Sequence, residues 1–129
     1  MKYKTFVDID PSFIANPVTK DLAILNDSKA ILFSIKNLVL TNYYERPFNS
    51  SLGSPVYQLL FDIIDSDQFS IVMKRAVFDV INTYEPRVDV TDVSVVDSPD
   101  NNRIYLKIQA NIKNTRLPIM ANITLERTR

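Results

Sequence analysis

The hydrophobic pattern of this 129-residue chain changes its period at Pro86. Before it, apolar residues recur every three or four positions, the spacing of an amphipathic helix. After it, they alternate with polar residues, which is the pattern of a strand with one buried face. Helices first and strands last are typical of an α+β domain. We therefore predict an N-terminal arm and three helices packed on an antiparallel meander sheet of three, at most four, strands.

Three segments have the helical period: residues 26–41, 55–64 and 66–84. Asp27 or Ser28 is expected to cap the first, because their side-chain oxygens can accept backbone N–H bonds. Ser54 and Pro55 have the composition of an N-cap followed by a first helical position. The third helix has the clearest apolar face, made of Phe69, Val72, Met73, Ala76, Val77, Val80, Ile81 and Tyr84.

Three segments have the strand period: residues 87–96, 103–113 and 119–128. The alternation slips at Thr91–Asp92, which indicates a bulge or bend. Residues 97–102 are expected to form a turn. The inward faces are expected to be Val88, Val90, Val93 and Val95 on the first strand; Ile104, Leu106, Ile108, Ala110 and Ile112 on the second; and Ile119, Ala121, Ile123 and Leu125 on the third.

The first 27 residues have no long period, and prolines interrupt them twice. We interpret residues 1–27 as an arm, with a short strand in "TFVDI" docked on the body, and residues 28–129 as a single domain. A loop between the first two helices holds the only glycine, Gly53. A lone glycine indicates a positive φ or a close backbone approach, since a Cβ is tolerated in neither.

Composition excludes several kinds of chemistry. The chain has no His and no Cys, so it cannot build a disulfide, a thiolate zinc site or a Ser-His-Asp triad by itself. One glycine is too few for a Gly-rich phosphate loop. Fifteen basic and fifteen acidic residues cancel, so no global field favours nucleic acid or a membrane surface. The apolar runs are too short for a membrane span, and Asp8 and Asp10 interrupt any signal peptide. We expect no cofactor, metal, nucleic acid, membrane or small-molecule substrate.

Carboxylates are the main reactive groups that remain, so a glycosidase-like acid pair is the most plausible enzymatic alternative. The candidates are Asp62, Asp65 and Asp67, with Glu45 and Glu85 elsewhere. Asp65 and Asp67 fall in a link between helices, where aspartate is a common cap. We therefore expect no catalytic residue.

The junction Glu85-Pro86-Arg87 carries two opposite charges around a rigid residue. Proline disfavours helical dihedrals at the residue before it, so the third helix should end near Tyr84. In an extended chain, residues two apart point to the same side. Glu85 and Arg87 then form either a solvent-exposed pair of little energetic value or a preorganised clamp for a partner. Geometry alone favours the exposed pair.

Several ordered motifs resemble the baseplate wedge, or sheath-initiator, proteins of contractile phage tails, a family similar to a baseplate component of type VI secretion systems. The motifs are Ser-Ile-x-Asn-Leu at residues 34–38, Glu-Arg-Pro-Phe at 45–48, Gly-Ser at 53–54, Leu-Phe-Asp at 60–62 and Glu-Pro-Arg-Val at 85–88. The resemblance covers about residues 28–96. Tyr44 replaces the family's usual glycine, and Asp62 stands where Glu is commoner.

The resemblance implies a structural role, without enzymatic activity, in the baseplate of a virion assembled in the host cytoplasm. Glu85, Pro86 and Arg87 would dock on a helical core bundle of other wedge proteins, with Arg46 and Phe48 as further partner-binding residues. Sheath chains would add strands to the sheet, which suits the open edges of a small meander. The charges at Glu85 and Arg87 then favour the clamp. A type VI secretion component is the nearest alternative, and a carboxylate muramidase the more distant one.

Overall fold

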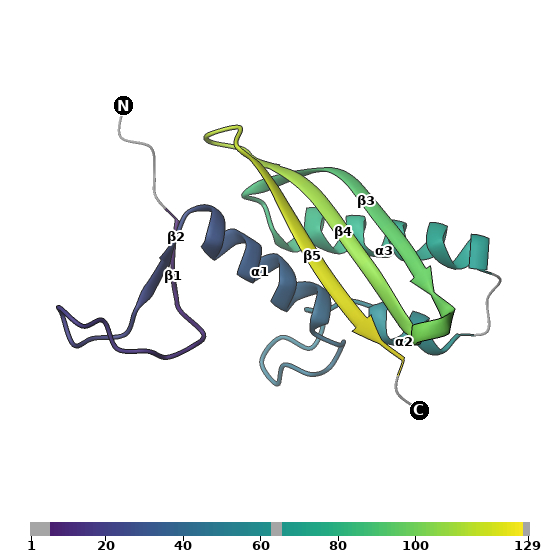
Figure 1. Ribbon diagram of the computed structural model, residues 1–129, viewed down its shortest axis with the longest axis horizontal. Coiled ribbons are helices and arrows are strands. Elements are labelled where there is room, and N and C mark those ends of the chain that lie inside the picture. Colours follow the sequence, from purple (N-terminus) through teal and green to yellow (C-terminus); the bar gives the residue numbers. More distant parts are fainter. Residues whose placement is uncertain (1–5, 63–65, 128–129) are drawn as a thin grey trace.

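The computed structural model describes residues 6–62 and 66–127 and has an α+β architecture (Figure 1). The elements in chain order are β1 (Val7–Ile9), β2 (Ile24–Asn26), α1 (Ser28–Leu40), α2 (Val56–Phe61), α3 (Ser66–Tyr84), β3 (Val88–Ser98), a 3-10 turn (Pro99–Asn101), β4 (Arg103–Ile112) and β5 (Pro118–Glu126).

Strands β3, β4 and β5 form the predicted antiparallel meander, in that order. The register of β3 on β4 shifts between Val90 and Asp92, which confirms the bulge expected at the slip in the alternation. Asn102 ends the 3-10 turn in the left-handed conformation (φ 51°) that lets β4 reverse the chain direction. The β4–β5 register runs without a shift from Arg103 opposite Glu126 to Asn111 opposite Pro118.

Helices α1 and α3 cover one face of this sheet, α3 against β3 and α1 against β5 (Figure 1). The prediction that all three helices pack on the sheet is wrong in detail, because α2 packs chiefly on α3 and α1. The predicted inward faces of β4 and β5 are all buried, and α1 buries Ile31, Ile35, Leu38 and Val39. On α3, Val72 (40% exposed) and Tyr84 (36% exposed) lie at the margin of the buried stripe rather than inside it.

Two predicted N-caps are wrong. Asp27 makes no capping bond to α1; its carboxylate instead accepts the backbone N–H of Phe6 (3.3 Å). Ser54 is buried, and its hydroxyl donates to the backbone carbonyl of Val39 instead of capping α2. Pro55 precedes α2 as its cap residue. Both side chains make tertiary connections, which a sequence pattern for local capping cannot indicate.

The first residues described do not add a strand to the larger sheet. Instead, β1 pairs with β2 to form a separate two-stranded antiparallel sheet at the start of α1 (Figure 1). In the part of the chain that the structure describes, the larger sheet therefore has three strands, not four. The boundary between an arm at 1–27 and a domain at 28–129 stays a prediction. No helix among the described residues has the length and apolarity that crossing a bilayer requires.

Candidate docking site

Pro86 separates α3 from β3, as the sequence predicts. Helix α3 ends at Tyr84, and the backbone N–H of Glu85 still donates to the carbonyl of Ile81 (2.8 Å). Pro86 and Arg87 form a turn rather than the extended chain expected, and β3 begins at Val88. The two charged side chains nevertheless meet.

Arg87 binds Glu85 through two parallel hydrogen bonds. Its Nε donates to Oε1 of Glu85 (2.6 Å), and its Nη2 donates to Oε2 (2.8 Å). The hydroxyl of Ser34 on α1 also donates to Oε2 (2.6 Å), across 51 residues of sequence. Helix α1 thus contacts the junction through Ser34, and both carboxylate oxygens of Glu85 accept hydrogen bonds from within the chain. Such charge-assisted, bidentate pairs are short and directional.

The burial of this pair differs from the solvent-exposed pair that geometry alone favoured. The Glu85 side chain is 4% exposed and the Arg87 side chain 27% exposed. Glu85 is therefore not solvent-exposed, and only part of the Arg87 side chain reaches the surface.

Electrostatics agree with this geometry. Burial acts to raise the pKa of the Glu85 carboxyl, but the hydrogen bonds from Arg87 and Ser34 outweigh it, so that the pKa lies below its usual value. The hydrogen bond to Glu85 raises the pKa of Arg87. The pair is therefore ionised at neutral pH.

Phe6 covers one side of the Arg87 guanidinium, whose central carbon lies 5.3 Å from the ring centroid, a cation–π arrangement. Phe6 directly precedes β1 and is tied to the start of α1 by reciprocal bonds with Asp27. Sequence reasoning missed both Ser34 and Phe6 as parts of this site. A polar residue on the apolar side of α1 was the available signal for Ser34, and Phe6 offered none.

The loop between α1 and α2 holds Arg46 and Phe48. Its base is closed by the backbone bond from Ser54 N–H to the Thr41 carbonyl (2.8 Å). At Gly53, a Cβ would lie 2.7 Å from the carbonyl carbon of Asn42, which confirms the predicted close backbone approach. The loop thus presents an exposed Arg46 and a fully exposed Phe48 (102%) from a fixed base.

Tyr44, directly before the Glu-Arg-Pro-Phe motif, has φ +65°. This left-handed conformation costs nothing for glycine and about 1–2 kcal/mol for a residue with a Cβ. Tyr44 N–H donates to the Ser50 carbonyl (2.9 Å), and the Glu45 carboxylate accepts from Asn42 N–H (2.8 Å). These bonds hold the turn that keeps Tyr44 in the left-handed conformation.

A cavity of about 260 Å³ lies between the loop, α1 and the two-stranded sheet. Arg46 borders it from the loop, Ser34 from α1, and Asp8 from β1. Ser34 therefore belongs both to this cavity, which Arg46 borders, and to the hydrogen bonds of the Glu85–Arg87 pair. Phe48 does not line this cavity.

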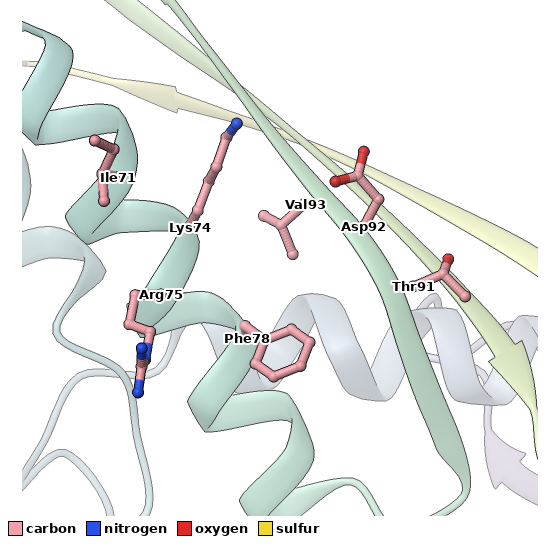
Figure 2. Close-up of a pocket in the computed structure, with 7 residues that line it drawn as sticks. All are labelled: Ile71, Lys74, Arg75, Phe78, Thr91, Asp92 and Val93. Atoms are coloured by element: carbon pink, nitrogen blue, oxygen red, sulfur yellow. The ribbon is translucent and has the colours of Figure 1, made fainter.

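Two further grooves run along the edges of the larger sheet. One, of about 340 Å³, lies between α3 and β3 at the bulge; Figure 2 shows its apolar lining residues Phe78 and Val93, with Lys74 and Asp92 at its rim. The other, of about 260 Å³, lies between α1 and β5 and is lined by Leu32, Phe33, Lys36, Met120, Ala121, Asn122 and Ile123.

The carboxylates considered for catalysis are not assembled into a cleft among the described residues. Asp62 and Asp67 are exposed, and Asp65 lies outside the described residues. Glu85 has a lowered pKa, whereas a general acid needs a raised one. The described residues contain no cluster of three or more acidic side chains able to hold a metal ion.

Several solved structures share this fold, among them the following three. A chain of the anti-feeding prophage baseplate has a TM-score of 0.73 at 21% identity, covering 85% of this chain and 87% of that chain. A chain of the type VI secretion system baseplate complex has a TM-score of 0.63 at 15% identity, covering 78% and 93%. A protein from Geobacter sulfurreducens, named as a candidate tail lysozyme, has a TM-score of 0.65 at 19% identity, covering 78% and 93%.

No curated protein matches the chain. At the level of sequence, the family model described as baseplate wedge protein gp25 matches residues 26–117, which includes α1, the loop with Arg46, and the Glu85–Arg87 junction. The chain therefore belongs to the baseplate wedge protein gp25 family.

Proposed function

We propose that this protein is a structural component of the baseplate wedge in a contractile phage tail, without enzymatic activity. It docks on a helical bundle of other wedge proteins through Arg87, Arg46 and Phe48, and it initiates the sheath by accepting a strand at its sheet edge. The family match carries the assignment to the baseplate. The observation that supports the docking site is the Glu85–Arg87 pair, whose orientation is fixed by hydrogen bonds between the two side chains and from Ser34.

Within this site, Glu85 and Arg87 have different roles. Glu85 is buried and positions the guanidinium, because both of its oxygens are already bound within the chain. The guanidinium group of Arg87 is partly exposed, and its hydrogen bonds to Glu85 hold its N–H donors in one orientation. A preorganised side chain loses little conformational entropy on binding, which favours affinity. Arg87 is therefore the group that contacts the partner, and its donors suit helix C-terminal carbonyls or a carboxylate.

Arg46 and Phe48 extend this surface. Aromatic and arginine side chains dominate the binding energy of protein interfaces. Phe48 is fully exposed and therefore contributes nothing to the hydrophobic core of this chain. Both residues can be changed without disturbing buried contacts. Substitutions at Arg46 and Phe48 therefore test docking without disturbing folding. Charge reversal at the buried Glu85 would disturb both.

The test replaces both exposed residues, Arg46→Glu with Phe48→Ser, in cells that produce tails. We expect an unchanged melting temperature of the purified protein and at least tenfold less of it in purified particles, measured by quantitative mass spectrometry. The matched control is Lys107→Glu with Val96→Ser, on the solvent face of the sheet. Normal incorporation of the loop variant would refute docking through this loop.

Strand addition is proposed at β5 rather than β3. In the β4–β5 ladder, Ile112 N–H donates to Leu117 O, and Arg127 N–H donates to Asn102 O at the other end. Hydrogen-bonded pairs alternate along an antiparallel ladder, so odd-numbered β5 residues bond to β4. The N–H and C=O groups of Met120, Asn122 and Thr124 then point to the open edge.

The two edges differ in regularity. A bulge interrupts β3 between Val90 and Asp92, and bulges at edges oppose strand pairing. The β4–β5 register has no shift over nine residue pairs. The groove beside β5 offers Leu32 and Phe33 of α1 as an apolar floor for the inward side chains of an added strand.

Asn122→Pro tests this edge, since proline removes one outward donor while the side chain stays on the solvent face. We expect baseplates that contain the protein but do not nucleate sheath, observed by electron microscopy of particles. Asn122→Ala is the control at the same position and should form normal sheath. Normal sheath on the proline variant would contradict strand addition at β5.

Two other assignments have direct tests. A type VI secretion baseplate is the alternative assembly of the same class, and genes for a tail or a secretion apparatus beside the coding sequence separate the two. A muramidase would turn over peptidoglycan in a purified assay, and one of the replacements Asp62→Asn, Asp65→Asn or Asp67→Asn would abolish it. Such a result would overturn the structural assignment.

A further inference from the structure

The start of β1 reaches the docking arginine from a distant part of the chain. Phe6 is half-buried and packs against the hydrophobic core, and the centroid of its ring lies 5.3 Å from the central guanidinium carbon of Arg87. Asp8 is two residues further along, so it points to the same side of the strand as Phe6. It borders the cavity that Ser34 of α1 also lines. The start of β1 therefore turns one face toward Arg87 and α1.

Asp27 fixes the position of Phe6. The backbone N–H of Asp27 donates to the Phe6 carbonyl (2.6 Å), and the Asp27 carboxylate accepts the Phe6 N–H (3.3 Å). In a regular antiparallel ladder, the backbone carbonyl of Asp27 would accept this second bond. Here that carbonyl accepts the N–H of Ile31 in the first turn of α1 (3.1 Å), and the side chain takes its place in the ladder. Asp27 thus joins the start of α1 to the residue that covers Arg87.

The backbone of Asp27 is strained. Its φ is +50° with ψ −118°, although the residue carries a Cβ. Strained residues of this kind persist only where the surrounding structure imposes them, and they cluster at functional sites. The bonds to Phe6 and from Ile31 impose the conformation here. The connection between Phe6 and α1 is therefore maintained at a local conformational cost.

The ring of Phe6 limits how the guanidinium of Arg87 can move. A guanidinium is planar, and its five N–H donors lie in that plane. Glu85 binds two of the five along one edge, which leaves three. Those two bonds alone allow the plane to tilt about the line that joins the two carboxylate oxygens. A ring over one face blocks the tilt toward that side and attracts the cation electrostatically. Glu85 and Phe6 together fix the direction in which the remaining donors point.

We propose that Phe6 is a positioning residue for docking, which holds the guanidinium plane of Arg87 in the orientation that the wedge partner contacts. Residues 6–9 then form a strap over the docking arginine, anchored at Asp27. This inference rests on the proposed docking function, and it adds a segment that precedes the family match, which begins at residue 26. Arg87 remains 27% exposed with the strap in place, so its remaining donors reach a partner.

A role of Phe6 in packing alone has different consequences. Phe6 contacts the core, so a poorer fit at this position lowers stability in either case. Leucine keeps an apolar side chain but has no aromatic face, whereas tyrosine keeps the ring. Only the positioning role predicts that the state of the Arg87 guanidinium follows the presence of the ring.

Nuclear magnetic resonance of the purified full chain measures that state directly. The Nε–H group of Arg87 adjoins the carbon that faces the ring, and its hydrogen bond to Glu85 slows its exchange with water. We expect Phe6→Leu to remove the ring-current shift of this proton and to speed its exchange by about threefold, as the loss of one cation–π contact implies. Phe6→Tyr should retain both properties. Phe13→Leu, at an exposed phenylalanine between β1 and β2, is the matched control and should leave the resonance unchanged.

Competition in tail-producing cells tests what this orientation contributes to docking. Each variant is produced together with the wild-type protein, and quantitative mass spectrometry gives their ratio in purified particles. We expect about threefold less Phe6→Leu than wild type, and equal amounts for Phe6→Tyr and Phe13→Leu. Asp27→Ala removes the acceptor of the Phe6 N–H and should act like Phe6→Leu in both measurements, which keeps the proposal testable if the leucine variant fails to fold. Thermal melting of each purified variant checks folding.

The outcomes separate the strap from the docking function. If Phe6→Leu and Asp27→Ala leave the Arg87 resonance unchanged, or compete equally with wild type while Arg87→Lys is depleted, the strap is overturned and the docking function stands. Equal depletion of Phe6→Leu and Phe6→Tyr, with the resonance retained in the tyrosine variant, would show that Phe6 acts by packing and would also overturn the strap. Equal incorporation of Arg87→Lys would overturn the docking function itself.

Discussion

Arg87→Ala tests the energetic role of the buried pair. The substitution removes both guanidinium hydrogen bonds to the Glu85 carboxylate, whose side chain is 4% exposed, and leaves the Ser34 hydroxyl and the backbone of residue 87 as its partners. Removing one member of a buried pair costs about 3–5 kcal/mol, since the remaining charge is buried without compensation. Arg87 is 27% exposed, so water can enter the space, and the low end is expected, about 3 kcal/mol.

The loss should depend on pH in a direction fixed by Glu85. In the wild-type protein its folded pKa is lowered, so its contribution to stability is complete above the unfolded pKa near 4.5 and is lost as pH falls through the folded value. In the variant, burial is no longer outweighed and the folded pKa rises. The buried charge of Glu85 then lowers the unfolding free energy of the variant at pH 7. Acidification protonates the carboxyl and removes this destabilisation. The difference in unfolding free energy between the two proteins should therefore shrink between pH 7 and pH 4.

Urea denaturation of both proteins at pH 7 and pH 4 measures this difference. Arg75→Ala is the control, because Arg75 and Asp79 form an exposed pair one turn apart on α3. Exposed pairs contribute about 0–1 kcal/mol, so the control should change little. A loss below about 1 kcal/mol for Arg87→Ala, or a loss independent of pH, would refute the argument that Glu85 is a buried, compensated charge.

Three further changes have defined outcomes. Glu85→Gln removes the titrating group and should flatten the acid limb of the stability–pH curve between its lowered folded pKa and the unfolded pKa near 4.5, measured by the same denaturation series. Tyr44→Gly relieves a left-handed conformation and removes an exposed side chain, so the unfolding free energy should rise by about 0.5–1 kcal/mol; a fall would show that the ring stabilises the loop. Gly53→Ala places a Cβ 2.7 Å from the Asn42 backbone and should cost about 2 kcal/mol or more, with an unchanged midpoint as the contrary result.

The sequence by itself determined the architecture of the sheet and its two covering helices. Hydrophobic period is a local property, so alternation at Ile104 to Ile112 and a slip at Thr91 were enough to predict a buried face and a bulge. Pro86 fixed the end of α3 for the same reason, since its ring acts on the residue next to it.

Only the tertiary structure decided the state of the candidate docking site. Sequence spacing brought Glu85 and Arg87 together, but their burial depends on Ser34 and Phe6, which lie 51 and 81 residues away from Glu85 and Arg87, respectively. The caps assigned to Asp27 and Ser54 failed similarly, because each side chain bonds to a distant backbone group. A local pattern specifies which faces are apolar, whereas the partner of a polar side chain is set by how those faces pack. Long-range packing therefore turned an apparent surface pair into a buried carboxylate that orients one partly exposed arginine.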